Sequence, residues 1–487
     1  MVDVRVTSGA LSGTWKSGVA VFRGIPYAAA PVGANRFAAP QPAKSWDGVR
    51  PAVSFGPPPP QSDALGRGPS GVSGDDWLTV NVWSPAPGPA AKLPVLVWIY
   101  GGAYTLGSAA WPEYDGGHLA RAGVVLVTLN YRLGIEGFAH LAGAPANRGL
   151  LDQVAALEWV HENIAAFGGD PGRVTIFGES AGGGAVAALL AMPRATGLFR
   201  GAVAQSMPGT FLTPELAADI AEACAAELDL PPTADALATI DPARLAAAGD
   251  AVTATAPART DRWGPAASRS ILFAPIVDGD TLPTTPWQAL ASGAARDVTL
   301  LAGHTRDEHR LFTAMFGPAT PDQTETALRL LAPTPDSYRE FDPAQRHELV
   351  QSDWLFRMPT LHLADAQLAG GGRAYFYELT WPAPGLGGIL GACHGLDVPL
   401  VFGNLTSGGP AALLGETPGP EAIELSARMR SAWTAFATNG DPGWPAYRPD
   451  EFLTQILDVP GAVTPYPEQP SRKIWQNHKF APLTLRP

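Results

Sequence analysis

The sequence predicts an α/β protein built on a mostly parallel central sheet with helices on its faces. Residues 93–100 and 124–131 are short, almost continuously apolar runs, as expected of strands buried on both faces of a parallel sheet. Longer stretches with helical periodicity alternate with such runs along the chain. This alternation is typical of a doubly wound sheet with right-handed crossovers.

The remaining elements follow in order. Residues 151–167 carry apolar side chains at three- and four-residue spacings and end at a Gly-Gly-Asp-Pro sequence, which predicts an amphipathic helix. A strand over 173–177 and a helix over 181–192 come next. The later predicted elements are strands over 201–205, 271–277, 298–302 and 374–379, and a helix over 421–438.

Composition and charge exclude several classes of protein. With Lys+Arg 33 against Asp+Glu 45, the 487-residue chain carries a formal charge of −12, which weighs against binding to nucleic-acid phosphates. The hydrophobic content of 46% exceeds that of disordered chains. Apolar runs fall short of the roughly 20 residues of a membrane-spanning helix, and the first residues lack the pattern of a secretory leader. We expect no nucleic-acid partner, no membrane anchor and a cytoplasmic location, with monomer and homodimer both open.

We expect one domain over residues 1–487, with insertions on a single sheet. A prior of about 150 residues per domain would allow three domains, but large α/β proteins often carry insertions instead. Residues 52–74 are rich in Pro, Gly and Ser and predict a surface loop. Residues 212–266 and about 310–370 predict helical regions that pack outside the sheet.

A turn between two of these elements carries a candidate nucleophile. Residues 178–182 read Gly-Glu-Ser-Ala-Gly, between the strand over 173–177 and the helix over 181–192. A tight strand-to-helix turn strains its central residue, and flanking glycines remove Cβ atoms that would collide. This context is the one in which a G-x-S-x-G sequence presents a reactive serine, here Ser180. The alternative is a glycine-rich turn with a capping serine.

A second small-residue turn follows the strand over 93–100. There the backbone N–H groups of Gly102 and Ala103 can approach a ligand closely. The N–H of Ala181 lies at a helix N-terminus, where developing negative charge is favoured. We expect these three groups to bind an oxyanion.

His394 is the candidate base. It stands in a small-residue loop after the predicted strand over 374–379, whereas most other histidines lie in helical or charged contexts. The order serine, acid, histidine is the one found when a nucleophilic serine follows a strand in this way. The alternative is a histidine with a purely structural role.

The acid that orients the base should follow a late strand. The strand over 298–302 runs into a segment that contains Asp307 and Glu308. Neighbouring side chains point in different directions, so only one of the two can orient His394. Candidates elsewhere in the chain are Asp152, Asp278 and Asp280.

Several motifs, taken in order, resemble those of the type-B carboxylesterases, the branch of α/β-hydrolases that contains the cholinesterases and bacterial para-nitrobenzyl esterases. The resemblance covers residues 9–447. The matching segments are 22–28 (FRGIPYA), 31–33 (PVG), 130–134 (NYRLG) and 177–183 (FGESAGG), and the last matches the nucleophile signature of the family in full.

The resemblance implies an α/β-hydrolase fold whose helical insertions cover the active site. The residues that it implies for catalysis are Ser180 as nucleophile, Glu308 as acid, His394 as base, and Gly102, Ala103 and Ala181 as oxyanion donors. It also implies a structural ion pair between Arg36 and Asp75. No cofactor or metal is expected.

These residues together predict a serine carboxylesterase that cleaves small-molecule esters through an acyl-enzyme intermediate. Small to medium apolar or aryl esters are the expected substrates. Aromatic residues close in sequence to the motifs form the expected pocket: Tyr104, Trp111, Phe211, Phe312 and Phe316. The alternatives are an amidase or carbamate hydrolase with the same triad, or a non-catalytic cholinesterase-like binding module.

The two cysteines, Cys224 and Cys393, lie far apart and exclude a disulfide framework. Trp77 stands where secreted members of the resembled family usually have a cysteine, which supports a reducing compartment. Cys393 directly precedes His394. We therefore expect activity to be sensitive to thiol reagents.

Overall fold

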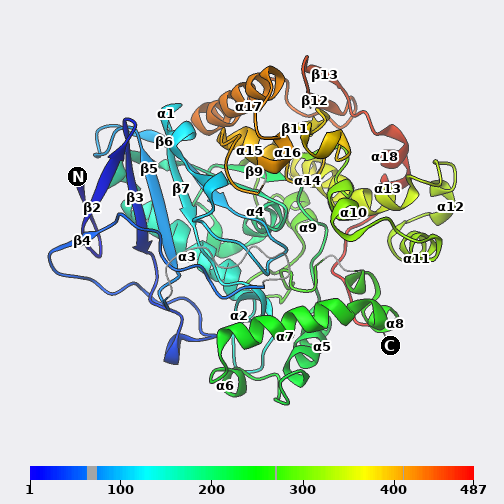
Figure 1. Ribbon diagram of the computed structural model, residues 1–487, viewed down its shortest axis with the longest axis horizontal. Coiled ribbons are helices and arrows are strands. Elements are labelled where there is room, and N and C mark those ends of the chain that lie inside the picture. Colours follow the sequence, from blue (N-terminus) through cyan, green and yellow to red (C-terminus); the bar gives the residue numbers. More distant parts are fainter. Residues whose placement is uncertain (63–73, 269–270, 410, 487) are drawn as a thin grey trace.

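Thirteen strands form one sheet in the computed structural model, which describes residues 1–62, 74–268, 271–409 and 411–486 (Figure 1). In spatial order the strands are β1 (Val2–Val6), β2 (Gly9–Lys16), β3 (Val19–Pro26), β5 (Thr79–Ser84), β7 (Val125–Leu129), β6 (Leu93–Ile99), β8 (Gly169–Glu179), β9 (Gly201–Gln205), β10 (Thr299–Thr305), β11 (Arg373–Leu379), β12 (Leu453–Leu457) and β13 (Ala462–Pro465), with β4 (Val49–Pro51) beside β2. The strands from β7 to β12 on this path are parallel, and those at the two edges are antiparallel.

Helices connect the parallel strands. Before β8 the chain forms α1 (Gly117–Arg121), α2 (Gly134–Phe138) and α3 (Arg148–Asn163). Between β8 and β10 it forms α4 (Ala181–Ala191), α5 (Pro214–Ala226), α6 (Ala234–Leu237), α7 (Pro242–Thr255), α8 (Thr260–Trp263) and α9 (Pro286–Ala291). Between β10 and β11 it forms α10 (Arg310–Phe316), α11 (Pro321–Leu331), α12 (Pro335–Tyr338), α13 (Arg346–Ser352) and α14 (Met358–Ala369). The last helices are α15 (Asp397–Phe402), α16 (Ala411–Leu414), α17 (Pro420–Asn439) and α18 (Gln469–Trp475). In Figure 1, α5 to α8 lie together at the bottom and α15 and α17 at the top.

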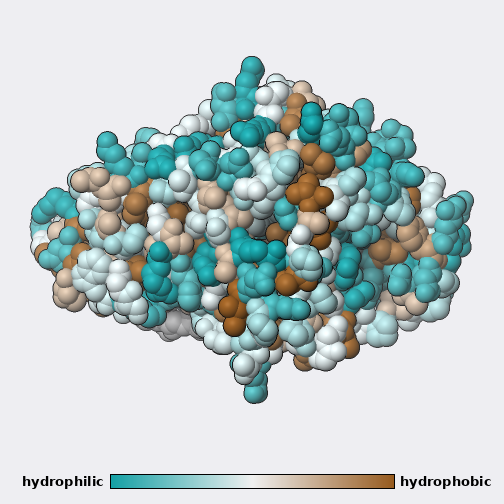
Figure 2. Space-filling view, turned by 90° about the horizontal axis from the view of Figure 1, so that it is seen from above, coloured by the Kyte–Doolittle hydropathy of each residue, from teal (hydrophilic) through white to brown (hydrophobic). Residues whose placement is uncertain are grey.

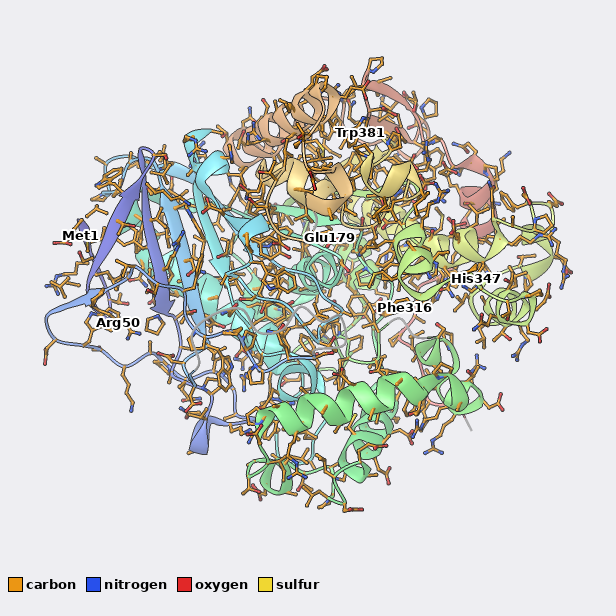
Figure 3. The ribbon with its side chains drawn as sticks, viewed as in Figure 1. Met1, Arg50, Glu179, Phe316, His347 and Trp381 are labelled. Atoms are coloured by element: carbon orange, nitrogen blue, oxygen red, sulfur yellow. The ribbon has the colours of Figure 1, made fainter. Side chains whose placement is uncertain are left out.

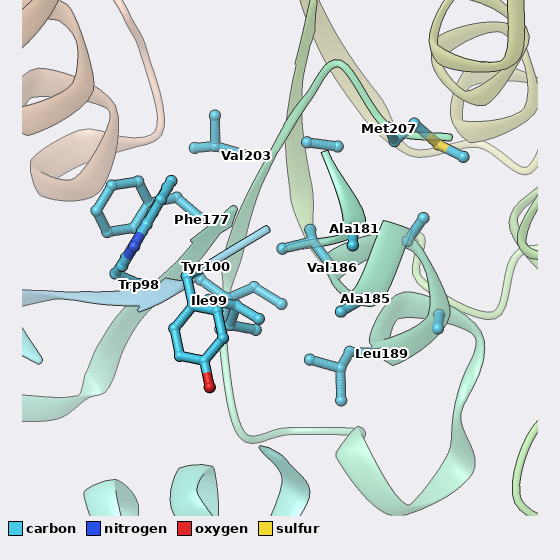
Figure 4. Packing of buried hydrophobic residues seen from close by; sticks show 14 of the residues in the cluster. Trp98, Ile99, Tyr100, Phe177, Ala181, Ala185, Val186, Leu189, Val203 and Met207 are labelled. Carbon is cyan, nitrogen blue, oxygen red and sulfur yellow. The ribbon is translucent and has the colours of Figure 1, made fainter. Parts of the chain in front are cut away.

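The central strands are buried because helices cover both faces of the sheet. β6 and β8 lie side by side, and the rings of Trp98 and Phe177 meet with centroids 4.7 Å apart. Helix α4 turns Val186 and Leu189 toward these strands (Figure 4). Burial on both faces explains why β6 and β7 read as unbroken apolar runs. The predicted mostly parallel sheet flanked by helices is confirmed.

One predicted strand, over 271–277, is wrong. Within it, Ile276 forms only an isolated bridge to Leu212. The side chain of Asn147 donates to the carbonyl of Ile276 at 2.8 Å and accepts its N–H at 2.7 Å, so both backbone groups are satisfied without a strand neighbour. Pro275 in addition has no N–H to donate to a ladder.

Five strands lie before residue 93, where no strand or helix was predicted. In β2 the burial alternates residue by residue from Gly9, as expected of a strand with one face on the core. Two of the three buried positions in β2 are Gly9 and Gly13, so the sequence shows little of the apolar alternation that marks such a strand. Residues 63–73 of the predicted surface loop lie outside the described residues, and residues 52–62 contain neither helix nor strand.

The predicted ion pair between Arg36 and Asp75 is wrong. Nη2 of Arg36 instead lies 2.5 Å from Oε1 of Glu136, and its Nη1 donates to the carbonyl of Ala238 at 2.8 Å. Glu136 is buried on α2, whereas Asp75 is exposed. A buried carboxylate needs a partner more than an exposed one does, because water solvates the exposed group.

Apolar residues on the face shown in Figure 2 form small patches separated by polar ones. Across the described ranges, the helices are all too short or too polar to cross a membrane.

Candidate active site

Ser180 stands in a strained turn between β8 and α4. Its backbone has φ 56° and ψ −128°, a conformation that L-residues rarely adopt. A Cβ on Gly182 would lie 2.0 Å from the carbonyl oxygen of Ile99, and one on Gly178 would lie 2.5 Å from the carbonyl oxygen of Gly182. Only glycine therefore fits at positions 178 and 182. The tight turn that these glycines allow holds Ser180 at the carboxyl edge of the sheet.

The turn after β6 approaches the serine closely. A Cβ on Gly101 would lie 2.9 Å from the Cβ of Ser180. Gly102, Ala103 and the next residue, Tyr104, all have positive φ. In the part of the chain that the structure describes, the N–H groups of Gly102, Ala103 and Ala181 donate no hydrogen bond. These donors are available to a ligand beside Ser180.

His394 and Glu308 are joined by a short contact. Nδ1 of His394 lies 2.6 Å from Oε2 of Glu308, and the other carboxylate oxygen accepts the N–H of Thr305 at 2.9 Å. Burial alone would raise the pKa of Glu308, but the adjacent His394 lowers it below its ordinary value. The ionised carboxylate thus fixes the orientation of the imidazole ring.

Asp307, the other acid of this segment, faces a different way. Its Oδ2 accepts the N–H of Ala392 at 2.9 Å and lies 3.0 Å from Nη2 of Arg306. Asp307 therefore ties the loop that carries His394 to the turn after β10. The acids elsewhere in the chain have other partners: Asp152 is paired with Arg132 at 2.7 Å, Asp278 accepts N–H groups from Asp280 and Leu282, and Asp280 is exposed.

The second ring nitrogen of His394 has a partner that sequence reasoning missed. Nε2 lies 3.1 Å from Oε1 of Glu179, the residue directly before Ser180. Glu179 lies near the centre of the molecule (Figure 3). Among the described hydrogen bonds none joins Ser180 Oγ to Nε2. The available signal was the carboxylate at the second position of the G-x-S-x-G sequence.

Buried carboxylates dominate the electrostatics around His394. Burial alone would lower the pKa of His394, but the carboxylates of Glu179 and Glu308 raise it above its ordinary value. Burial raises the pKa of Glu179, and the nearby Asp397 and Glu308 add to this effect. Asp397 accepts hydrogen bonds from Gln205 at 2.8 Å and from the hydroxyl of Tyr377 at 2.9 Å.

The five aromatic residues predicted to line the pocket lie in different surroundings. Phe312 is partly buried, and its ring centroid lies 5.4 Å from that of His394. Phe316 is 61% exposed at the end of α10. The other three pack against neighbouring rings: Tyr104 on Phe138, Trp111 on Tyr114 and Phe211 on Trp287. Proximity in sequence to the motifs did not distinguish pocket residues from core residues. The roles of these five residues in a pocket stay predictions.

The thiol of Cys393 is buried, and burial raises its pKa to about 12. A thiol reacts as its thiolate, so this environment opposes the reactivity expected from its position beside His394. For metals, no group of three or more His, Cys, Asp or Glu side chains is arranged to hold an ion among the described residues.

The site holds the parts that acyl transfer needs. It combines a serine at a helix N-terminus, a buried His–Glu pair and backbone N–H groups that donate to no acceptor within the described ranges. All of them lie where β6, β8, β10 and β11 end, the edge at which open α/β sheets bind ligands.

Comparisons with known proteins agree with this architecture. The model of the carboxylesterase family matches residues 2–457. The chain is 39% identical to the para-nitrobenzyl esterase of Bacillus subtilis over 96% of either chain. It is 32% identical to the phenmedipham hydrolase of Pseudarthrobacter oxydans, covering 94% of this chain and 95% of that protein.

A solved structure has the same fold. The crystal structure of the carboxylesterase EST55 of Geobacillus stearothermophilus superposes with a TM-score of 0.85 at 37% identity, over 97% of this chain and all (100%) of that one.

Proposed function

Since the chain belongs to the carboxylesterase family, we propose that Ser180, His394 and Glu308 are the catalytic triad with which it hydrolyses esters. Ser180 Oγ attacks the ester carbonyl while His394 Nε2 accepts its proton. Glu308 holds the imidazole and stabilises its positive charge. The protonated His394 then gives the proton to the departing alcohol, and water repeats the sequence on the acyl-enzyme to release the acid.

The N–H groups of Gly102, Ala103 and Ala181 bind the oxyanion in this proposal. Two observations support this: the three N–H groups donate to no acceptor among the residues that the structure describes, and the turn at Gly101 lies close to Ser180. Donors fixed in place before the reaction stabilise the tetrahedral intermediate without reorganising.

The observation that carries the triad is the 2.6 Å contact between His394 and Glu308 beside the strained turn of Ser180. Ser180 Oγ and Nε2 have to approach each other during the reaction. Such hydrogen bonds often tighten only when substrate is bound.

One sheet supplies the whole site, because Ser180 follows β8, Glu308 follows β10 and His394 follows β11. We therefore propose a single catalytic domain over residues 1–487, with the helical regions 212–266 and about 310–370 as covers of the site. The free, buried thiols of Cys224 and Cys393 support a reducing compartment such as the cytoplasm.

Small to medium apolar or aryl esters are the proposed substrates. The support is the partly exposed ring of Phe312 beside His394 and the likeness to a para-nitrobenzyl esterase. Hydrolysis of an amide or carbamate by the same triad is the second candidate, favoured by the likeness to phenmedipham hydrolase.

Two experiments test the proposal. A fluorophosphonate should label the folded protein at Ser180 alone, and Ser180→Ala should lower kcat by at least about 10⁴-fold, or about 5.5 kcal/mol. The turnover rates of a para-nitrobenzyl ester, its matched amide and the carbamate phenmedipham would show which type of bond the enzyme prefers. Labelling elsewhere, or an active Ser180→Ala protein, would refute the triad, and faster turnover of phenmedipham or the amide would favour the second candidate.

A further inference from the structure

The ring of Phe356 lies on the face of the proposed base. Its centroid is 4.2 Å from that of the His394 imidazole and the two planes differ by 28°, the shortest centroid distance of any ring pair in the described part of the chain. Phe356 is buried. The sequence motifs assign it no role.

The edge of the same imidazole faces a carboxylate at each nitrogen, and the one at Nδ1 is hydrogen-bonded to it. Glu308 lies 2.6 Å from Nδ1 and Glu179 lies 3.1 Å from Nε2. The more distant ring of Phe312 stacks on Phe356 with planes 10° apart. Glu308 thus fixes one corner of the imidazole, and the ring of Phe356 is the nearer of two aromatic rings against its plane.

A π-helical turn directs Phe356 toward His394. This turn, Asp353–Arg357, joins α13 to α14. Pro359 has no N–H to donate to the carbonyl of Leu355, and that carbonyl instead accepts the N–H of Gly209 at 2.8 Å. A π-helical turn within an α-helix is frequently found at a functional site.

Buried charges anchor the turn on both sides of Phe356. Nε of Arg357 lies 3.3 Å from Oδ1 of Asp353, and its Nη2 lies 3.0 Å from Oε2 of Glu468, just before α18. The hydroxyl of Tyr338 on α12 donates to Asp353 at 2.6 Å. The backbone that carries Phe356 is therefore tied to two other helices.

We propose that Phe356 is a positioning residue for His394, which fixes the plane of the imidazole and stabilises the positive charge that the ring carries during acyl transfer. This inference rests on the proposed role of His394 as the base. The aromatic face of phenylalanine attracts a cation within about 6 Å of its centroid, an interaction of ~0.5 to 2 kcal/mol. That range corresponds to a factor of about 2 to 30 in rate.

Other charged or titratable groups also face His394. They are Glu308 after β10, Glu179 at the end of β8, Asp397 on α15 and His309 before α10. The replacement of Phe356 alone leaves all four of these groups in the chain. A change in the pH profile of such a variant therefore reports on the ring.

The test compares Phe356→Leu and Phe356→Tyr with wild type and with Phe436→Leu. Phe436 is an equally buried residue on α17 and serves as the control for lost core packing. Each protein is assayed for kcat, KM and the pH dependence of kcat/KM on a chromogenic ester, with rates corrected for the folded fraction. Phe356→Met replaces the leucine variant if the latter does not fold, because methionine adapts to irregular spaces.

We expect Phe356→Leu to lower kcat about 3- to 30-fold with KM changed less than about twofold. The acidic limb of its kcat/KM profile should move to lower pH, because the imidazolium of His394 loses a stabilising partner. Phe356→Tyr should keep most of kcat, and Phe436→Leu should lose stability alone. The inference would be overturned if the leucine or methionine variant kept the wild-type kcat and the wild-type acidic limb. It would also be overturned if the tyrosine variant lost as much kcat as the leucine variant. If Ser180→Ala remained active, the proposed function itself would fail instead.

Discussion

Glu179 and His394 are in direct contact, with Oε1 of the glutamate 3.1 Å from Nε2 of the histidine. Nε2 is the atom that has to accept a proton from Ser180 in the proposed reaction. The carboxylate therefore raises the basicity of the histidine and lies beside its reactive nitrogen. This contact makes Glu179 a residue whose replacement should change the pH dependence of the enzyme.

We expect Glu179→Gln to move the acidic limb of the kcat/KM profile to lower pH by at least ~0.5 unit. The charge of Glu179 raises the pKa of His394, so its removal lowers that pKa and leaves more neutral base at a given acidic pH. The measurement is kcat/KM across the pH range on one chromogenic ester. A limb that stayed in place, or moved to higher pH, would contradict the electrostatic role of Glu179.

The two adjacent acids after β10 should differ sharply. Glu308→Gln removes the charge that supports the imidazolium, so kcat should fall by about 10³- to 10⁴-fold. Asp307→Asn keeps an oxygen that can accept the N–H of Ala392, and we expect a loss below about tenfold. Steady-state kinetics on both variants decide which residue is the triad acid. A larger loss of kcat in Asp307→Asn than in Glu308→Gln would assign that role to Asp307.

Cys393 should resist alkylation in the folded protein. Its thiol is buried, and its pKa is raised to about 12, so little thiolate forms at neutral pH. Incubation with iodoacetamide should leave activity unchanged, whereas a serine-directed phosphonate should abolish it. Mass spectrometry should find Cys224 and Cys393 modified only after denaturation. Rapid loss of activity with modification of Cys393 would restore the expectation drawn from its position in the sequence.

The buried ion pair of Arg132 and Asp152 should matter for stability. Nη2 of Arg132 lies 2.7 Å from Oδ1 of Asp152, and both side chains are fully buried. Asp152→Ala leaves an unpaired buried guanidinium and should lower the free energy of unfolding by ~3–5 kcal/mol. Glu451→Ala breaks the exposed contact with Arg448 and should cost at most about 1 kcal/mol. Urea unfolding followed by tryptophan fluorescence compares the two, and equal shifts would contradict the distinction.

Much of the fold could be predicted from local patterns. The apolar runs of β6 and β7 follow from the burial of these strands on both faces. The helical periodicity of α3 follows from its packing on the sheet through one face. The strand over 271–277 was wrong because Asn147, far away in the sequence, satisfies the backbone of Ile276. The antiparallel strands before residue 93 were missed because glycine and polar residues interrupt their apolar faces.

Some predicted site residues depend on local sequence, whereas others depend on contacts between distant elements. The turn around Ser180 is encoded locally, since only glycine fits at positions 178 and 182. The aromatic pocket was inferred from proximity along the chain, and among its five residues only Phe312 has a ring contact with His394 in the described structure. Side-chain direction depends on packing between distant elements.

By itself, the sequence determined the central strands β6 to β11 with helices α3 and α4, the serine turn and the family to which the chain belongs, because each depends on neighbouring residues or on motifs in order. The motifs already implied Glu308 as the acid, and the tertiary structure shows its contact with His394. Only the tertiary structure decided that Glu179 and Phe356 complete the surroundings of the ring. These contacts join the ends of β8 and β10, a π-helical turn and a loop after β11. No local pattern specifies how such separate segments meet, since their relative positions follow from the packing of the whole sheet and its helices.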